Sequence, residues 1–164
     1  MIDNKKTKIG IIIIIIIIIL IDQITKIMAI TNNSQSIGII SLGYKSEEKM
    51  SADGIIMSVL TDIVVFAIII KFLKEQSKNM NVKVKISLSC ILGGGISNLI
   101  DKIWNHNVIE FIKIGNLPAI NLAYVILVIG WILFVILMVK NTIKIREEIR
   151  QIDEQKKTIG REKE

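Results

Sequence analysis

Five side chains that could take part in acid–base or hydrogen-bond chemistry lie in the second half of the chain, between apolar segments. They are Asn98, Asp101, Glu110, Asn121 and Tyr124. Two neighbouring carboxylic acids can share a proton, so that one acts as a general acid and the other as a general base. Acids are costly in or near a bilayer, and a membrane segment that carries them is by default a candidate functional site. The elements that hold these residues must bring them together.

The composition is that of a membrane protein. Of the 164 residues, 51% are hydrophobic and only 5% are aromatic, and the mean hydropathy is +0.57, which is too apolar for an ordinary small soluble domain. The formal net charge of +6 does not indicate nucleic-acid binding, because the basic residues flank apolar segments and form no stripe with interleaved aromatics. We expect one domain, with the lipid bilayer as its main partner and no nucleic acid.

The sequence predicts no metal site and no cofactor. Cys90 is the only cysteine and His106 the only histidine, so a disulfide, a thiolate site and a multi-histidine site are all excluded. The glycines from Gly93 to Gly95 lack the lysine of a phosphate-binding loop. We expect these glycines to allow close packing between helices. Cys90 is expected to pack in the membrane as a small residue.

Apolar stretches predict four membrane-spanning helices. They run over about residues 9–30, 55–73, 84–103 and 118–139, and each is close to the roughly 20 residues that a spanning helix needs. The basic start and isoleucine run resemble a secretory signal peptide, but the apolar stretch continues past Asp22 to about Ile30 with no small-residue cleavage site. Pro118 falls at the start of the fourth stretch, where its missing backbone donor does little harm.

Lysines and arginines predict the orientation. They concentrate at the amino end, between the second and third spans, and in the carboxyl tail, and short cytoplasmic segments carry such an excess. Both termini are therefore expected in the cytoplasm, with residues 31–54 and 102–117 outside. Within these outer segments, Ile37–Tyr44 and Val108–Ile114 favour short strands, although an interfacial helix end would show a similar alternation.

Residues 141–164 form a charged tail after a membrane domain of residues 1–140. Isoleucines recur in the tail at helical spacing, at positions 145, 149, 152 and 159. We expect a solvated cytoplasmic helix, with a short coiled-coil contact as the alternative.

Helical spacing brings the polar residues of the spans to one level. Asp22 and Lys26 are four residues apart near the outer end of the first helix, so they can face each other. Asn98 and Asp101 share one face of the third helix, and Asn121 opens the fourth, one turn before Tyr124. All of these positions belong to the outer end of the predicted bundle.

Four ordered motifs carry a resemblance to a known family. Residues 22–26 read Asp-Gln-Ile-Thr-Lys, residues 93–102 read Gly-Gly-Gly-Ile-Ser-Asn-Leu-Ile-Asp-Lys, residues 108–111 read Val-Ile-Glu-Phe, and residues 120–124 read Ile-Asn-Leu-Ala-Tyr. In order and spacing they resemble the motifs of lipoprotein signal peptidases (signal peptidase II). That family consists of four-helix aspartyl proteases of the bacterial plasma membrane, which remove signal peptides from lipid-modified prolipoproteins. The resemblance implies an all-α integral membrane fold with a small extracytoplasmic β or loop element.

The departures from the family pattern fall on its catalytic positions. The resemblance places the two catalytic aspartates at positions 110 and 124, where this chain has Glu110 and Tyr124. It also gives Ser97 for a glycine and Lys102 for an arginine, and Ala52 where a substrate-binding motif has an asparagine. Asp22, Lys26, Asn98, Asp101 and Asn121 match the family and are expected to frame the site.

The substitutions impair the expected chemistry. An aspartic dyad needs one protonated and one ionised carboxyl group. Glu110 could supply one of them, displaced by a methylene group, but a tyrosine phenol ordinarily ionises only near pH 10 and is a poor base at neutrality. Asp62, an unusual acid within the second span, would restore a pair if it faced Glu110; it could equally pair with Lys26 or line the bundle interior.

Three hypotheses remain open. The first is a catalytically impaired, signal peptidase II-like membrane protein that binds or modulates lipid-modified prolipoprotein signal peptides. The second is an active aspartic-type endopeptidase that removes these signal peptides, using Glu110 with another acid. The third, an unrelated membrane scaffold or transporter subunit, is disfavoured by the order of the motifs.

Overall fold

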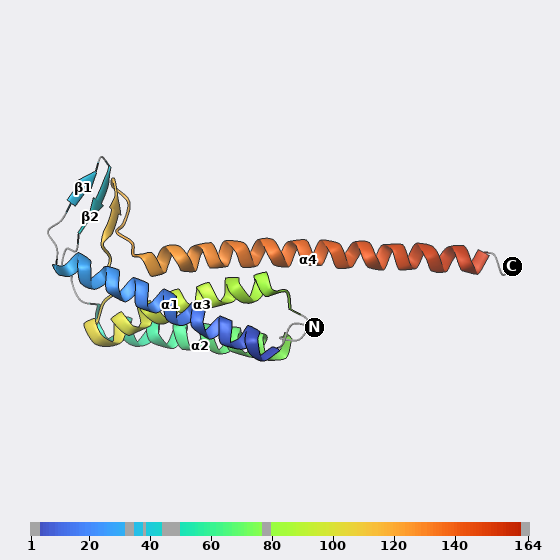
Figure 1. Cartoon of the computed structure of the whole chain (residues 1–164), viewed down its shortest axis with the longest axis horizontal. Helices are drawn as coiled ribbons and strands as arrows, with labels where there is room; N and C mark the ends of the chain where they lie inside the picture. The colour runs from blue at the N-terminus through green and yellow to red at the C-terminus, as the bar shows by residue number, and fades with distance from the viewer. Residues whose placement is uncertain (1–3, 32–34, 38, 44–49, 77–79, 162–164) are drawn as a thin grey trace.

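The computed structural model describes residues 4–31, 35–37, 39–43, 50–76 and 80–161. It has four long helices, α1 (Asn4–Thr31), α2 (Ala52–Gln76), α3 (Val82–Asn105) and α4 (Leu122–Arg161), with a small sheet at one end of the bundle (Figure 1). Each helix is long and apolar enough to cross a membrane. The predicted class, an all-α membrane bundle of four spans with a small β element, is confirmed.

Helix α3 is the centre of the bundle and packs against each of the other three helices. Its buried residues follow one another through the middle of the helix, whereas α1, α2 and α4 expose large apolar side chains along most of their length. Apolar side chains on the outside are expected where the surroundings are lipid tails. The apolar core contains Ile69 of α2 and Leu88, Ile91 and Leu92 of α3.

The three consecutive glycines of α3 face three different helices. A Cβ atom on Gly93 would lie 3.0 Å from Ile18 of α1, one on Gly94 would lie 2.5 Å from the backbone oxygen of Ala123 at the start of α4, and one on Gly95 would lie 2.6 Å from the Phe66 ring of α2. Successive helical residues point about 100° apart, so one triplet serves three neighbours. The expected role in close helix packing fits this geometry.

The sheet lies at the end of the bundle where α1 and α3 end and α4 begins. Its strands are β1 (Gln35–Ile37), β2 (Ile40–Leu42) and β3 (Ile112–Ile114), in the order β1-β2-β3 with both pairs antiparallel. Strands were expected over 37–44 and 108–114, and both exist but are shorter, with an additional strand before the first. Positions 38 and 44 lie outside the described residues. Residues 108–111 are not in a strand, and the backbone of Ile109 is hydrogen-bonded to the side chains of Asp101 and Asn121 instead.

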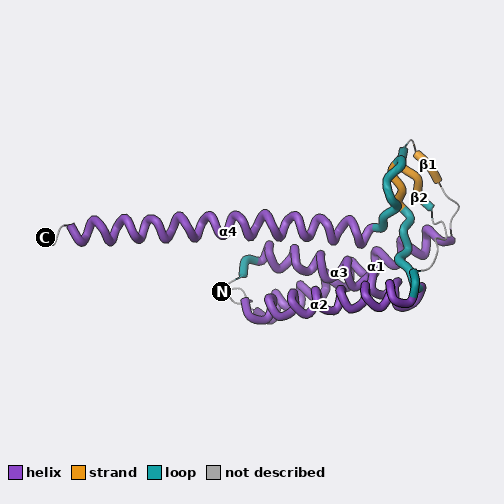
Figure 2. Tube along the Cα trace, turned by 180° about the vertical axis from the view of Figure 1, so that it is seen from behind, coloured by secondary structure: helices purple, strands orange, loops and turns teal. Residues whose placement is uncertain are grey.

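Helix α4 continues without interruption from the membrane span into the charged tail. Figure 2 shows it running past the end of the other three helices as a single rod. The tail was expected to be helical, and the structure shows that it belongs to the same helix as the fourth span. Along the rod, ion pairs one turn apart join Lys144 to Glu148 and Arg150 to Glu154. The division into a membrane domain and a cytoplasmic tail stays a prediction.

Candidate functional site

A buried group of three charged side chains lies toward the C-terminal ends of α1 and α3. The Lys26 ammonium forms ion pairs with Asp22, one turn away on α1, and with Asp101 of α3 at 2.7 Å. None of the three is more than 1% exposed. Two carboxylates and one ammonium leave one net negative charge, which would be costly to bury without further hydrogen bonds.

Those hydrogen bonds come from four parts of the chain. Asp22 accepts from the Ser97 hydroxyl and from the backbone N–H of Ala123, both at 2.7 Å. Asp101 accepts from the Gln23 amide at 3.0 Å and from the backbone N–H of Ile109 at 3.1 Å. Within the described residues, every buried side-chain nitrogen or oxygen has a partner.

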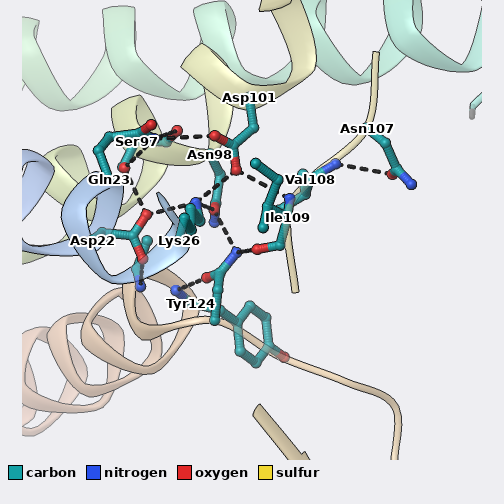
Figure 3. Close-up of polar contacts among 12 residues, drawn as sticks. Asp22, Gln23, Lys26, Ser97, Asn98, Asp101, Asn107, Val108, Ile109 and Tyr124 are labelled. Atoms are coloured by element: carbon teal, nitrogen blue, oxygen red, sulfur yellow. Dashed lines mark hydrogen bonds and ion pairs between the residues drawn. The ribbon is translucent and has the colours of Figure 1, made fainter. Parts of the chain in front are cut away.

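Two asparagines connect this group to the start of α4. The side-chain oxygen of Asn98 accepts from Lys26 at 3.1 Å and from the Asn121 amide at 2.9 Å. The Asn121 amide also donates to the carbonyl oxygen of Ile109 at 3.1 Å, and its oxygen accepts from the backbone N–H of Tyr124 at 2.7 Å, as an N-cap residue does. We call the complete set the polar cluster: Asp22, Gln23, Lys26, Ser97, Asn98, Asp101 and Asn121 (Figure 3).

The polar cluster fixes the backbone on either side of the two candidate catalytic positions. Glu110 is partly buried and lies between Ile109 and Phe111, which are both buried. The Phe111 N–H donates to the carbonyl oxygen of Ile120 at 3.0 Å. Residues 109–111 therefore run beside residues 120–121, which lead into α4.

Tyr124 does not point into the polar cluster. Its side chain is 49% exposed, and Figure 3 shows its ring directed away from Asp22, Lys26 and Asp101. The phenol thus occupies a position next to the framed backbone without joining its hydrogen bonds. A tyrosine oriented in this way supplies neither a buried acid nor a buried base.

Asp62 has a partner that the sequence did not suggest. It forms an ion pair with Lys102 of α3 at 2.7 Å, whereas the cation considered for it, Lys26, is bound to Asp22 and Asp101. Helix α2 is thereby joined to the last turn of α3. The position that resembles a family arginine thus carries a lysine that holds α2.

Sequence reasoning missed the structural importance of Gln23 and Ser97. The Gln23 amide donates to Asp101 and to the Ser97 hydroxyl, the latter at 3.0 Å. The spacing contained part of the signal, because Ser97 lies four residues before Asp101 and therefore on the same face of α3. The backbone donors of Ile109 and Ala123 left no signal in the sequence.

A small groove lies between the outer end of α1 and the sheet, next to the residue that follows Glu110. Its volume is about 300 Å³, and its lining is mainly apolar: Thr25, Met28, Ala29, Gln35, Leu42, Gly43 and Phe111. Such a groove can accept an apolar side chain or part of an acyl chain. Among the described residues, no three histidine, cysteine, aspartate or glutamate side chains are placed to hold a metal ion.

A family model described as "Signal peptidase (SPase) II" matches residues 14–140. Lipoprotein signal peptidases of Staphylococcus aureus strains JH9, JH1 and Newman are each 32% identical to this chain over 94 residues, which is 55% of this chain and 56% of each relative. The matched part therefore spans about half the length of these curated relatives.

Two solved structures, each described as a bacterial membrane enzyme, share the fold. The first has a TM-score of 0.68 and covers 81% of this chain and 89% of its own, and the second has a TM-score of 0.69 and covers 80% and 93%. Both are 22% identical to this chain. At this identity the similarity concerns the arrangement of the helices and the sheet.

Proposed function

The chain belongs to the signal peptidase II family, as a multi-pass protein of the bacterial plasma membrane, and we propose that it binds lipid-modified prolipoprotein signal peptides while cleaving them poorly or not at all. Both termini lie in the cytoplasm in this proposal, which puts the polar cluster and the sheet at the outer face of the membrane. The basic residues at the opposite end of the bundle support this orientation.

The observation that carries the proposal is a network of buried ion pairs and hydrogen bonds, which we call the frame, next to two positions where the family aspartates are replaced. The buried ion pairs and the Asn98–Asn121 hydrogen bond hold residues 109–111 beside the start of α4. A frame of this kind is what a catalytic pair would need, since misplacement by about 1 Å can cost ~100-fold in rate. The two side chains that it presents are Glu110 and Tyr124.

The geometry supports a loss of hydrolysis. An aspartic mechanism requires two carboxyl groups close enough to share a proton. Three aspartates of the membrane helices are already ion-paired: Asp22 and Asp101 with Lys26, and Asp62 with Lys102. Recruiting Asp62 would leave Lys102 without its partner, and recruiting Asp22 or Asp101 would break one of the two ion pairs of Lys26.

Retention of binding is supported by the groove beside the frame. The apolar lining contributed by Met28, Leu42 and Phe111 suits a signal peptide or its acyl chain. The alternative function is an active endopeptidase that uses Glu110 with another acid. If that acid were Asp22, Asp62 or Asp101, the aspartate would have to leave its lysine.

A cleavage and binding assay on the purified full chain separates these functions. A fluorescent, diacylglyceryl-modified signal peptide should bind in detergent and remain intact. Its cleavage by the wild type, abolished by Glu110→Gln, would establish the alternative. An unmodified peptide of the same sequence serves as the control for lipid recognition. Absence of binding by the modified peptide would refute the proposal.

A further inference from the structure

A second, larger groove lies at the opposite end of the bundle from the polar cluster. It has a volume of about 880 Å³ and is formed by the end of α2, the start of α3 and the middle of α4. This volume falls within the ~300–1,000 Å³ range of small-molecule sites. Its basic wall contains Lys83, Lys140 and Lys144, and its apolar wall contains Phe72, Leu137 and Met138. We call it the basic groove.

The basic wall carries charge that, among the described residues, is neutralised only at Lys144. No acidic residue is found among the described residues that line the groove. Lys144 has one acidic neighbour, Glu148, at 3.5 Å, and no ion pair is formed by Lys83 or Lys140 within the described ranges. Because Lys140 and Lys144 are one helical turn apart, their ammonium groups share a face of α4. The groove is therefore complementary to an anion.

The position of the groove along α4 suits a lipid headgroup. Lys140 lies 18 residues after Leu122, and so about 27 Å along the helix axis at 1.5 Å per residue. That is close to the ~30 Å thickness of the hydrocarbon core. Lys140 and Lys144 therefore reach the headgroup region, and Leu137 and Met138, up to one turn earlier, remain at the level of the acyl chains. Figure 1 shows the bundle ending here while α4 continues alone.

We propose that the basic groove binds one anionic phospholipid of the inner leaflet. The three lysine ammonium groups hold the phosphate, and an acyl chain lies against Phe72, Leu137 and Met138. Basic pockets between membrane helices on the cytoplasmic side hold anionic headgroups in this manner. The bound lipid joins α2, α3 and α4 where the bundle opens, independently of whether the outer site cleaves peptides.

Native mass spectrometry of the purified full chain tests the proposal. The protein is mixed with palmitoyl-oleoyl phosphatidylglycerol or with phosphatidylcholine of the same acyl chains. We expect retention of one phosphatidylglycerol, with a preference over phosphatidylcholine of about tenfold or more, because each lysine near an anionic lipid contributes roughly fivefold. Equal retention of the two lipids would overturn the proposal.

A matched pair of triple variants distinguishes a specific lipid site from non-specific electrostatic attraction. Lys83→Gln, Lys140→Gln and Lys144→Gln together should abolish the preference. Lys8→Gln, Lys71→Gln and Lys74→Gln remove the same charge from the same end of the bundle, outside the groove, and should leave it unchanged. An equal loss in both would show non-specific attraction. If the first triple variant does not give folded protein, Lys140→Gln alone is expected to weaken the preference roughly fivefold.

Two further arms distinguish a lipid from a soluble phosphate. Met138→Trp places a larger side chain in the apolar wall and narrows the groove, while the lysines stay in place. It should therefore reduce retention of phosphatidylglycerol. Glycerol 3-phosphate, which has a similar phosphate and no acyl chain, should not displace the lipid. Unchanged retention by Met138→Trp, or displacement by glycerol 3-phosphate, would show that the groove holds an anion without a chain and would refute the lipid site.

Discussion

The side-chain amide of Asn121 donates to the carbonyl oxygen of Ile109, twelve positions earlier in the chain, at 3.1 Å. This hydrogen bond ties the segment that carries Glu110 to the first turn of the helix that carries Tyr124. Asp101 completes the restraint by accepting from the N–H of the same Ile109 at 3.1 Å. Both polar groups of one peptide segment are thus held by bundle side chains, which fixes the two candidate catalytic positions relative to each other.

Replacing Asn121 should release this restraint. Asn121→Ala removes the N-cap of α4, worth ~1 kcal/mol, and leaves a buried carbonyl group without its donor, at ~1–3 kcal/mol. We expect a loss of about 2–4 kcal/mol in the free energy of unfolding, measured by denaturant titration in mixed micelles. Asn116→Ala, at an exposed loop amide, is the control and should change little. Equal stabilities of the two variants would show that the connection to Ile109 is unimportant.

Loss of the central cation should be more damaging. Lys26→Met leaves Asp22 and Asp101 buried without a counter-charge, and breaking a buried pair in this way typically costs ~3–5 kcal/mol. The same titration should show this loss, and Lys8→Met, at an exposed lysine of the same helix, should be near neutral. Adding Asp22→Asn to Lys26→Met should recover part of the loss. A double variant less stable than Lys26→Met would contradict the pairing.

Restoring two aspartates tests whether the frame still supports catalysis. The variant Glu110→Asp with Tyr124→Asp should cleave a lipid-modified signal peptide at least about tenfold faster than the wild type, because two close carboxyl groups can again divide the acid and base roles. Glu110→Asn with Tyr124→Asn has the same shapes without the charges and is the matched control. Peptide binding without cleavage by the aspartate variant would mean that the frame no longer positions a dyad.

The stability of the protein should respond differently to an added methyl group at two glycines of the membrane helices, Gly94 and Gly10. A Cβ on Gly94 would meet the backbone oxygen of Ala123 at 2.5 Å, and a backbone cannot move aside as a side chain can. Gly94→Ala should therefore destabilise by ~1–3 kcal/mol, with thermal unfolding in detergent as the measurement. At Gly10 nothing lies within 4 Å of the added atom, so Gly10→Ala should stabilise α1 by up to ~1 kcal/mol. Similar melting temperatures for both would argue against the close approach of α3 and α4.

The orientation can be tested with single cysteines after Cys90→Ser. A membrane-impermeant maleimide should label Leu117→Cys in intact cells, because Leu117 is exposed in the outer segment. Lys83→Cys should react only after the membrane is opened, because positively charged segments stay in the cytoplasm. Labelling of Lys83→Cys from outside would reverse the proposed topology.

The sequence predicted the four spans because twenty apolar residues in succession have few alternatives to a membrane helix. It also predicted the contact between Asp22 and Lys26, since residues four apart on a helix are always neighbours. The positions of the polar residues within the spans predicted correctly that Asp22, Lys26, Asn98, Asp101 and Asn121 would meet at one end of the bundle.

The contacts between helices could not be predicted in the same way. Asp62 had several possible cations, and only the rotation of α2 against α3 selects Lys102. Hydrogen bonds to the N–H groups of Ile109 and Ala123 depend on the path of the backbone, which side-chain patterns do not encode. Strand β3 is shorter than the alternating pattern of residues 108–114 predicted, because the backbone of Ile109 is already hydrogen-bonded to side chains of the bundle.

The arrangement of α3 also bears on how the chain enters the membrane. Of the four spanning helices α3 is the least apolar, and 56% of its span is buried by the others, against 6–17% for the rest. Its serines, Lys85 and Asp101 make α3 less favourable in bare lipid than the other three helices. During synthesis α3 therefore depends on α1, already in the bilayer and bearing Lys26, to accept Asp101. Until α4 emerges, the face of α3 that bears Gly94 lacks its neighbour, the first turn of α4.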